Sequence, residues 1–368
     1  MKRLLSALLL LNAAFVISVV HAAEQHLYLA SGGKLTWYDI DPSSGELSQA
    51  GELEYEGVGP FTFSPDSKWL HAMLRKQDGF EIANVELLAD GGLKVFDAHP
   101  VKYRSGYLMV DATGGYIAGN HYSEGKASLW RLKDGRYMGE LVVELDLEPK
   151  AHSSIFSVDN RWLLVPATAP NKVFVNAFDA TSGSLKPNDP PYGEGPSGEQ
   201  DARHPRHLVF HPKLPNRAYT SNESKEPGVG VWDWDLEKGT IELIQNIVTR
   251  PDDIDDPMST ADLHFTPDGR YLYVSNRHTV RGAPPEQGRS AIVGFEVDPK
   301  DGRLSLIGHT TCENVPRSFC IDRSGRFLHT AGQRENRLGV YAIDPDSGHL
   351  EEVEQHEVGL GPIWVEAR

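Results

Sequence analysis

Short stretches in which apolar and polar residues alternate recur along the whole chain, and turns rich in Pro, Asp and Gly separate them. Residues 291–297 and 304–307 are one such pair, placed on either side of a turn at Gly302. Alternation with a period of two is typical of β-strands that bury one face. No segment indicates a helical domain, so the pattern predicts an all-β protein.

A turn of the form Asp-Pro-x-x-Gly-x-Leu, or a close relative of it, occurs seven times. Its glycines are Gly45, Gly92, Gly135, Gly183, Gly239, Gly302 and Gly348. Successive glycines lie 43 to 63 residues apart, which is the period of a four-stranded propeller blade. Each repeat also has an apolar strand, such as residues 59–66, followed by a strand with an aromatic or leucine start, such as Trp69-Leu70. The repeat predicts a β-propeller whose blades begin with their innermost strand.

The two ends of the chain complete the count of blades. Only six innermost strands precede residue 324, one fewer than the turns. Residues 26–30 have the pattern of a second strand, and residues 361–365 have that of an innermost strand. If these two pair, they close the ring and remove sheet edges that would otherwise be exposed. We therefore predict one seven-bladed propeller domain over residues 23–368.

The N-terminal residues have the features of a secretory signal peptide. Lys2 and Arg3 precede an apolar run over residues 4–20, and small residues follow in Val20-His21-Ala22. This order predicts cleavage after Ala22 or Ala23, with residues 1–22 as the signal. An uncleaved membrane anchor is the alternative, although the run is short for a span. We expect the mature protein to be periplasmic or secreted.

Charge and cysteine content narrow the possible partners. The formal charge is −16, and an acidic surface repels nucleic acid and anionic lipid. We expect no nucleic acid and, after signal cleavage, no membrane as a partner, and nothing in the sequence requires an oligomer. Cys312 and Cys320 fall on different strands, so free thiols are favoured over a disulfide.

Three connections between the predicted strands are longer than the others. Two of these, residues 187–204 and 250–260, come just before an innermost strand, and a third covers residues 281–289. Long loops on a rigid scaffold often shape a binding site. Residues 187–199 could equally form a mobile lid or be extra loop length without a role in binding.

One rim of the predicted channel gathers reactive side chains. The start of each innermost strand shares this rim with the end of the second strand, because the two run antiparallel. The starts place Gly59, Gly106, His152, Arg206, Ala261 and Arg317 there. The ends supply Arg75, Asn120, His121, Asn222, Glu223, Asn276, Arg277 and Gln333. The rim therefore combines several cations and imidazoles with one carboxylate.

Several of these segments resemble a known family. His152-Ser153-Ser154, residues 205–212 and Ser221-Asn222-Glu223 are similar to segments of the seven-bladed propeller lactonases, as are residues 261–264, 271–277 and 358–365. That family includes propeller-type 6-phosphogluconolactonases and carboxy-cis,cis-muconate cyclases. The likeness covers essentially the whole mature chain. It implies that His152, Arg206, Glu223 and Arg277 are the catalytic residues.

Lactone hydrolysis gives each of these residue types a role. Water must reach an ester carbonyl, and the developing oxyanion must be stabilised. Glu223 or His152 can act as general base, and the sequence does not decide between them. Arg206 and Arg277 can polarise the carbonyl or hold a carboxylate or phosphate. Further candidates for substrate binding are His207, His264, Arg317, Gln333 and Asn222, although Arg317 could equally bridge two blades.

No cofactor is expected. A metal site built from His152, Glu223, Asp262 and His264 is the mechanistic alternative, but these residues lack metal-motif spacing and lie among cations. An acidic loop over residues 252–256 could attract calcium.

The predicted signal peptide favours an unphosphorylated substrate, because phosphorylated sugar lactones are made in the cytoplasm. We expect the protein to hydrolyse a small-molecule lactone, glucono-1,5-lactone, to gluconate in the periplasm. A 6-phosphogluconolactonase and a muconate-type cyclase are alternative enzymes. A non-catalytic propeller that binds a protein or glycan is the alternative of another class. Such a rim usually exposes aromatic residues, and this rim offers only Tyr107 and Phe61.

Overall fold

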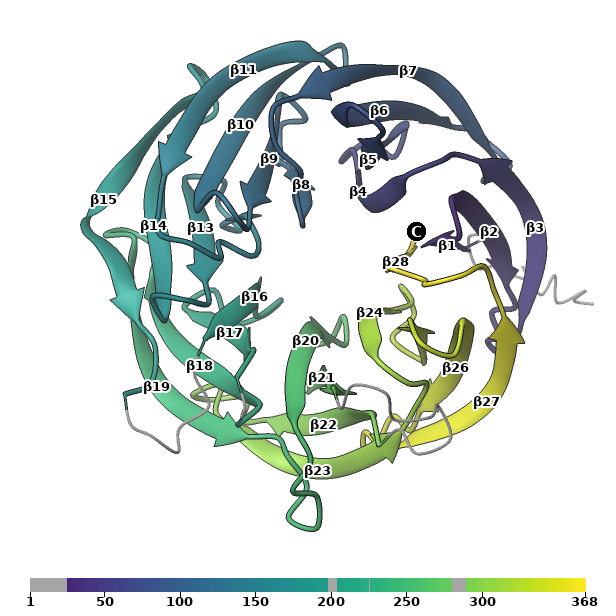
Figure 1. Ribbon diagram of the computed structural model, residues 1–368. Helices are drawn as coiled ribbons and strands as arrows, with labels where there is room; N and C mark the ends of the chain where they lie inside the picture. The colour runs from purple at the N-terminus through teal and green to yellow at the C-terminus, as the bar shows by residue number, and fades with distance from the viewer. Residues whose placement is uncertain (1–24, 198–203, 225, 280–288) are drawn as a thin grey trace, which may run out of the picture.

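The computed structural model describes residues 25–197, 204–224, 226–279 and 289–368. These residues form seven four-stranded antiparallel sheets, arranged as blades around a central channel (Figure 1). Within these ranges there is no helix, and accordingly no helix that could cross a membrane. The predicted all-β, seven-bladed propeller is confirmed.

In every blade the strands follow one another from the channel outwards. The first blade contains β28 (Trp364–Ala367), β1 (His26–Ser31), β2 (Lys34–Ile40) and β3 (Leu47–Glu54). The second and third contain β4 (Val58–Phe63), β5 (Trp69–Lys76), β6 (Gly79–Leu87), β7 (Leu93–Val101), β8 (Leu108–Val110), β9 (Tyr116–His121), β10 (Lys126–Lys133) and β11 (Arg136–Asp146). The fourth and fifth contain β12 (Ile155–Phe156), β13 (Trp162–Ala167), β14 (Lys172–Asp179), β15 (Ser184–Glu194), β16 (Pro205–Phe210), β17 (Arg217–Asn222), β18 (Gly228–Asp235) and β19 (Thr240–Val248). The last two contain β20 (Met258–Phe265), β21 (Tyr271–His278), β22 (Ala291–Val297), β23 (Leu304–Thr311), β24 (Pro316–Ile321), β25 (Phe327–Gly332), β26 (Arg337–Ile343) and β27 (Leu350–Glu357).

The ring is closed by the two ends of the chain, as predicted. β28 pairs antiparallel with β1, with Leu27 opposite Ala367 and Ala30 opposite Trp364. In Figure 1 the yellow C-terminal strand lies beside the purple first strand, on the side of the channel. The composite first blade therefore has the same four strands as the others, and its inner edge is covered.

The repeated turns contact the neighbouring blade. A Cβ atom built on Gly135 would come within 2.8 Å of Trp69, and one on Gly239 within 2.4 Å of Trp162. The other turns repeat this arrangement with Phe327, His26, Tyr116, Tyr219 and Tyr271. Each of these glycines has a positive φ, which a residue with a side chain adopts only at a cost. The turn glycine of one blade thus receives the ring that begins the second strand of the blade before it.

One turn differs from its prediction. In the second blade the residue with positive φ is Gly91, at 79°, and not Gly92. This turn lacks Pro and closes over four residues, because the N–H of Gly91 donates to the carbonyl of Leu88. In the longer turns the glycine N–H donates to the residue four positions earlier, as Gly45 does to Asp41. The shorter turn moves the special position back by one residue.

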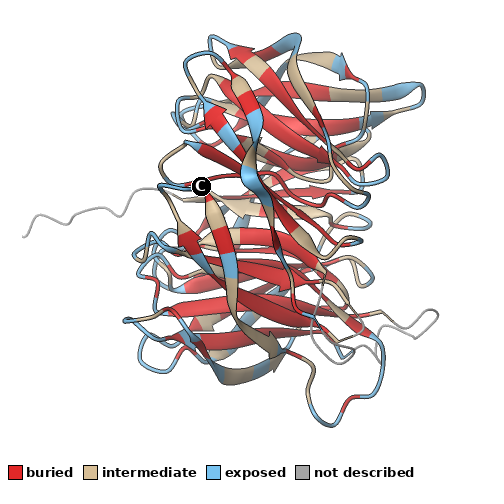
Figure 2. Ribbon diagram, turned by 90° about the vertical axis from the view of Figure 1, so that its left-hand side faces the viewer, coloured by how far each residue is buried: buried red, intermediate tan, exposed pale blue. Residues whose placement is uncertain are grey.

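The apolar core lies between adjacent blades. Buried side chains of one sheet pack against those of the next, as Tyr28 of β1 does against Phe63 of β4. Figure 2 shows the buried residues concentrated in the strands, with exposed residues in the turns at both faces. Phe61 is fully buried in this core, so the expectation that it is exposed at the rim is wrong.

Two of the long connections are partly strand. Residues 187–194 belong to β15, which pairs with β14 across a bulge between Phe174 and Asn176. Prolines are tolerated there because an outermost strand has unpaired N–H groups. Likewise, Met258–Thr260 already belong to β20. The remaining predicted loop, residues 281–289, lies almost wholly outside the described residues, as does the predicted signal peptide. Cys312 and Cys320 are free, as predicted.

Candidate active site

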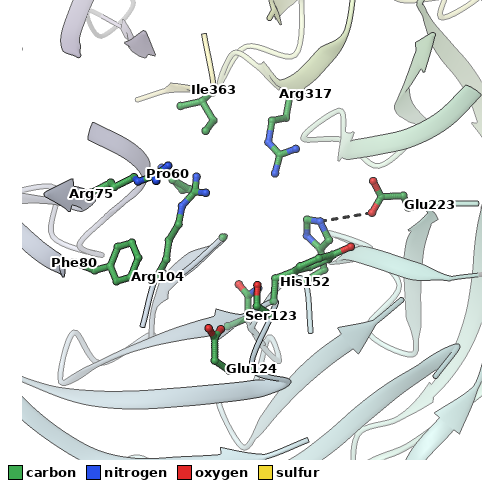
Figure 3. A pocket seen from close by; sticks show the side chains of 13 residues that line it. Pro60, Arg75, Phe80, Arg104, Ser123, Glu124, His152, Glu223, Arg317 and Ile363 are labelled. Carbon is green, nitrogen blue, oxygen red and sulfur yellow. Dashed lines mark ion pairs between the residues drawn. The ribbon is translucent and has the colours of Figure 1, made fainter. Parts of the chain in front are cut away.

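A cavity of about 480 Å³ opens at the rim where the sequence places the reactive side chains (Figure 3). Its wall includes His152, Glu223 and Arg317, which come from the fourth, fifth and last blades. Pro60, Arg75, Phe80, Arg104, Gly106, Asn120, Tyr122, Ser123, Glu124 and Ile363 complete the lining. Opposite walls of the cavity therefore differ: one carries the predicted catalytic groups, and the other is built by the first three blades.

Glu223 lies between three of the predicted catalytic partners. Its Oε1 accepts a hydrogen bond from Nη2 of Arg277 at 2.6 Å. Its Oε2 is 3.7 Å from Nε of Arg206 and 3.7 Å from Nε2 of His152. The structure thus brings all four residues together, from β16, β21, the segment after β17 and the segment before β12. The carboxylate sits where these elements converge at the channel.

The two arginines bound to Glu223 lie behind it and do not line the cavity. Arg206 is 1% exposed and Arg277 is 6% exposed. Arg277 also donates to Oγ of Ser259 and to the carbonyl of Thr260, both at 2.9 Å. In this arrangement they hold the carboxylate in place. Direct contact with a substrate carbonyl, which the sequence suggested for them, would require Glu223 to move.

Innermost-strand bulges determine where these side chains point. Pairing of β16 with β17 shifts between Pro205 and His207, so Arg206 lies at a bulge. Arg317 lies at an equivalent shift between Pro316 and Ser318 in β24. A bulge inserts an extra residue into one strand and re-aims the side chains around it. The bulges thus place a cation at the same level of two blades.

Three arginines face the cavity without a protein partner. Arg317 points into it from β24, and Arg104 and Arg75 reach it from the opposite wall (Figure 3). In the described part of the chain, none of the three guanidinium groups makes a hydrogen bond or ion pair. Burial and the nearby Arg277 lower the pKa of Arg317 to about 10, so it stays charged at neutral pH. The cavity is therefore prepared for negative charge on a ligand or in a transition state.

Local charges also determine the protonation of the two base candidates. Burial, followed by the charge of Arg206, holds the pKa of His152 well below its usual value. Burial alone would raise the pKa of Glu223, but Arg206 and Arg277 outweigh it and hold that pKa below its usual value. At neutral pH the site contains a neutral imidazole and an ionised carboxylate.

Four of the five predicted substrate-binding residues do not line the cavity; Arg317 is the exception. His207 is buried behind Arg206, and His264 lines a second cavity elsewhere in the channel. Oδ1 of Asn222 accepts a hydrogen bond from Oγ1 of Thr220, and its Nδ2 contacts Asn246, so it serves the packing of its blade. Gln333 is also absent from the lining. Strand ends alone did not show that these side chains turn away from the cavity.

Sequence reasoning missed the opposite wall. Arg104 precedes Gly106 by two residues, so the loop before the innermost strand would have indicated it. The sequence places Asn120 at the rim without indicating a role. Its Nδ2 donates to the carbonyl of Ala151 at 2.7 Å, whereas its buried Oδ1 has no hydrogen-bond partner among the described residues. Tyr122 packs edge-on against His152, with 5.4 Å between ring centroids. The aromatic residues at this cavity are Tyr122 and Phe80, whereas Tyr107 lines the second cavity.

The side chains considered as metal ligands do not meet in one place. His152 and Glu223 line the first cavity, whereas Asp262 and His264 line the second. Among the described residues, no group of three or more His, Cys, Asp or Glu side chains has an arrangement that could hold a metal ion. In the acidic loop, Asp256 pairs with His278 at 3.1 Å.

Comparison with known proteins agrees with the fold. The family described as "Lactonase, 7-bladed beta-propeller" matches residues 20–367. A 6-phosphogluconolactonase of Cronobacter sakazakii is 34% identical over 347 residues, which cover 93% of this chain and 98% of that protein. One from an Enterobacter species is 32% identical over 325 residues, covering 88% and 92%.

A solved structure shows the same architecture. The periplasmic gluconolactonase of Pseudomonas aeruginosa superimposes with a TM-score of 0.82 at 23% identity, covering 94% of this chain and 99% of that one. The blades, the cavity and these relatives agree on one assignment: the chain belongs to the seven-bladed β-propeller lactonase family and is a carboxylic-ester hydrolase that opens lactones.

Proposed function

We propose that this protein hydrolyses the ester bond of a sugar 1,5-lactone without a metal ion, with Glu223 as general base. The observation that carries this proposal is the position of Glu223, ionised between His152, Arg206 and Arg277 at the wall of an open cavity. Water loses a proton to the carboxylate as its oxygen bonds to the carbonyl carbon. The bond from that carbon to the ring oxygen then breaks, and the ring oxygen takes up a proton.

The remaining groups fit the other requirements of the reaction. Arg317 reaches into the cavity with its guanidinium unpaired, and it can stabilise the oxyanion that forms on the carbonyl oxygen. His152 is neutral and 5% exposed, which suits a group that orients water. Asn120 is a further polar residue of the lining, and its Nδ2 is held by the carbonyl of Ala151.

Glucono-1,5-lactone in the periplasm is the substrate we propose. The predicted signal peptide supports it, because phosphorylated sugar lactones form in the cytoplasm. The structural likeness to a periplasmic gluconolactonase is compatible with it, although that likeness concerns the fold. If the leader is removed, the mature protein from its native host begins at Ala23 or Glu24, and N-terminal sequencing of the periplasmic fraction checks this.

A specific observation favours 6-phosphogluconolactone as a second candidate. Arg75, Arg104 and Arg317 give the cavity more positive charge than a neutral lactone requires. A phosphate group would pair with such guanidinium groups. The two curated relatives described above also carry the name 6-phosphogluconolactonase.

Hydrolysis of both lactones by the purified mature protein tests the proposal. A pH-stat measures acid release with a chelator present, and the spontaneous rate is subtracted. We expect the protein to accelerate the hydrolysis of glucono-1,5-lactone, and we expect this acceleration to persist with the chelator present. Arg303→Gln, in an exposed turn, is the control and should leave the rate on the phosphorylated lactone unchanged. If Arg104→Gln lowers only that rate, 6-phosphogluconolactone replaces glucono-1,5-lactone as the proposed substrate. If the protein accelerates the hydrolysis of neither lactone, the proposal of sugar-lactone hydrolysis fails.

A further inference from the structure

A row of buried polar side chains runs from Glu223 into the centre of the channel. Asp262 and His207 lie behind Arg206, and these three residues are 4%, 3% and 1% exposed, respectively. Oδ1 of Asp262 is 2.8 Å from Nδ1 of His207. Nε2 of His207 is 3.0 Å from Nη1 of Arg206. The row therefore connects a second carboxylate, which the reaction itself does not use, to the guanidinium that faces Glu223.

The chemistry of the donors fixes the protonation of His207. An ionised carboxylate only accepts hydrogen bonds, and a guanidinium only donates them. Nδ1 of His207 must therefore carry the proton that Asp262 accepts, and Nε2 must be the acceptor for Arg206. Burial and the charge of Arg206 lower the pKa of His207 to about 4 despite the opposing effect of Asp262. His207 is thus neutral at physiological pH, with one defined tautomer.

This tautomer fixes the orientation of Arg206. Nη1 of Arg206 donates to Nε2 of His207 and, at 2.6 Å, to the carbonyl of Ala261. Both hydrogens of that nitrogen are then used, and the planar guanidinium cannot rotate without losing one bond. Its Nε is turned toward Glu223, 3.7 Å from Oε2, and makes no hydrogen bond with any residue that the structure describes. The direction of the Nε–H bond depends on groups on the side away from the substrate.

We propose that Asp262 is a positioning residue for lactone hydrolysis: it holds His207 in the tautomer that aims Arg206 at Glu223. This inference rests on the proposed role of Glu223. Asp262 does not line the site cavity, so it acts only through other residues. The bulge of β20 between Thr260 and Leu263 places it in the channel, one residue after the carbonyl that anchors Arg206.

Other charged groups face the two ends of this row. Oδ2 of Asp262 is 3.4 Å from Nε2 of His264, and Asp262 and Glu366 both line a second cavity of about 320 Å³. His152, Arg206, Arg277 and Arg317 are the titratable and charged groups that act on Glu223. Removing the charge of Asp262 without moving any atom would lower the pKa of Glu223, because a nearby anion disappears. Releasing Arg206 would raise that pKa, because a cation turns away.

The opposite signs of these effects make Asp262→Asn a decisive variant. We expect kcat to fall about tenfold or more with KM changed less than threefold, as for other residues that orient a catalytic group. We also expect the acid limb of kcat/KM to move to higher pH. Asp268→Asn is the matched control, because it makes the same change in an exposed turn of the same blade. An acid limb that moves down, or an unchanged kcat, would overturn the proposal.

Histidine ¹⁵N NMR of the wild-type protein tests the same proposal without an activity measurement. His207 is assigned as the resonance that disappears in His207→Gln. We expect neutral His207 with its proton on Nδ1 from pH 5 to 8. A charged His207, or one protonated on Nε2, would contradict the inference. If wild type opens neither lactone but His207 has the expected tautomer, the positioning of Arg206 stands and the proposed reaction fails.

Discussion

At the scale of single residues, the site separates two tasks between two sets of arginines. Arg206 and Arg277 are buried and hold Glu223, whereas Arg317 projects into the cavity and pairs with no side chain among the described residues. A carboxylate between buried cations is ionised over a wide pH range, but it is a weak base. A lactone ester is reactive enough to hydrolyse without a catalyst, so a weak base that is always ionised suits this reaction better than it would suit amide hydrolysis.

The first prediction concerns the pH dependence of hydrolysis. The pKa of Glu223 is held below its ordinary value of 4.5, so the carboxylate is ionised above that pH and becomes protonated as pH falls through the lowered value. We expect kcat/KM, corrected for the spontaneous rate, to be flat between pH 5 and 7.5 and to fall only in more acidic solution. An inflection within that flat range would contradict an ionised Glu223 as the base.

The sequence could predict which residues converge, but not what each of them faces. Alignment of the repeats places His152, Arg206, Glu223 and Arg277 at one rim, and the resemblance to the propeller lactonases singles them out there. The bulges in β16, β20 and β24 are not visible in an alternating pattern. They determine that Arg206 lies behind Glu223, that Arg317 faces the cavity, and that Asp262 reaches the channel. The alternating pattern did not indicate Arg104, because this residue precedes a strand of only three residues, β8.

At the scale of elements, the two repeated signals of the sequence are partners in space. The glycine of each outer turn packs against a ring that begins the second strand of the preceding blade. Hydrogen bonds reinforce this contact, as from the hydroxyl of Tyr219 to the carbonyl of Gly302 at 2.6 Å and from that of Tyr273 to Gly348 at 2.8 Å. The period of the sequence repeat therefore reflects the contact between each turn glycine and the neighbouring blade. Strand order and the composite blade followed from it, whereas the bulged outer strand β15 did not.

The second prediction tests this junction. Gly239→Ala places a methyl group 2.4 Å from Trp162 at a φ of 67°. Strain at positive φ costs roughly 1 kcal/mol, and overpacking against a ring adds about 1–3 kcal/mol. Gly139→Ala is the control, since its φ is 87° and nothing lies within 4 Å of the added atom. We expect denaturant unfolding to show Gly239→Ala as the less stable variant by at least 1 kcal/mol. Equal losses would show that the turn glycine is required for backbone conformation alone.

At the scale of the whole molecule, ring closure keeps the site together. The cavity is lined by Ile363 near the C-terminus and by residues of the second to fifth and last blades. These walls keep their separation only if the first and last blades stay joined. The pairing of β28 with β1 is that joint, and Val365 is 2% exposed within it. The formal charge of the whole chain is −16, whereas the cavity lining contains three arginines and only two carboxylates, Glu124 and Glu223.

The third prediction concerns this closure. Removing residues 362–368 deletes β28 and exposes the edge of β1. Loss of several buried side chains costs about 3–5 kcal/mol, and each kcal/mol moves the melting temperature of a large domain by about 2–4 °C. We expect a melting temperature lower by roughly 10 °C or more, measured by differential scanning calorimetry, together with loss of hydrolysis. A truncated protein that melts like the full chain would show that the ring does not depend on this strand.

The central claim is that Glu223 activates water in lactone hydrolysis, and Glu223→Gln tests it most directly. Glutamine keeps the shape and a hydrogen-bond acceptor for Arg277, but it cannot take a proton from water. With chelator present and the spontaneous rate subtracted, we expect the pH-stat rate on the preferred lactone to fall by about 10²–10⁴-fold, while the melting temperature stays close to that of wild type. A folded Glu223→Gln protein that opens the lactone at the wild-type rate would contradict the account.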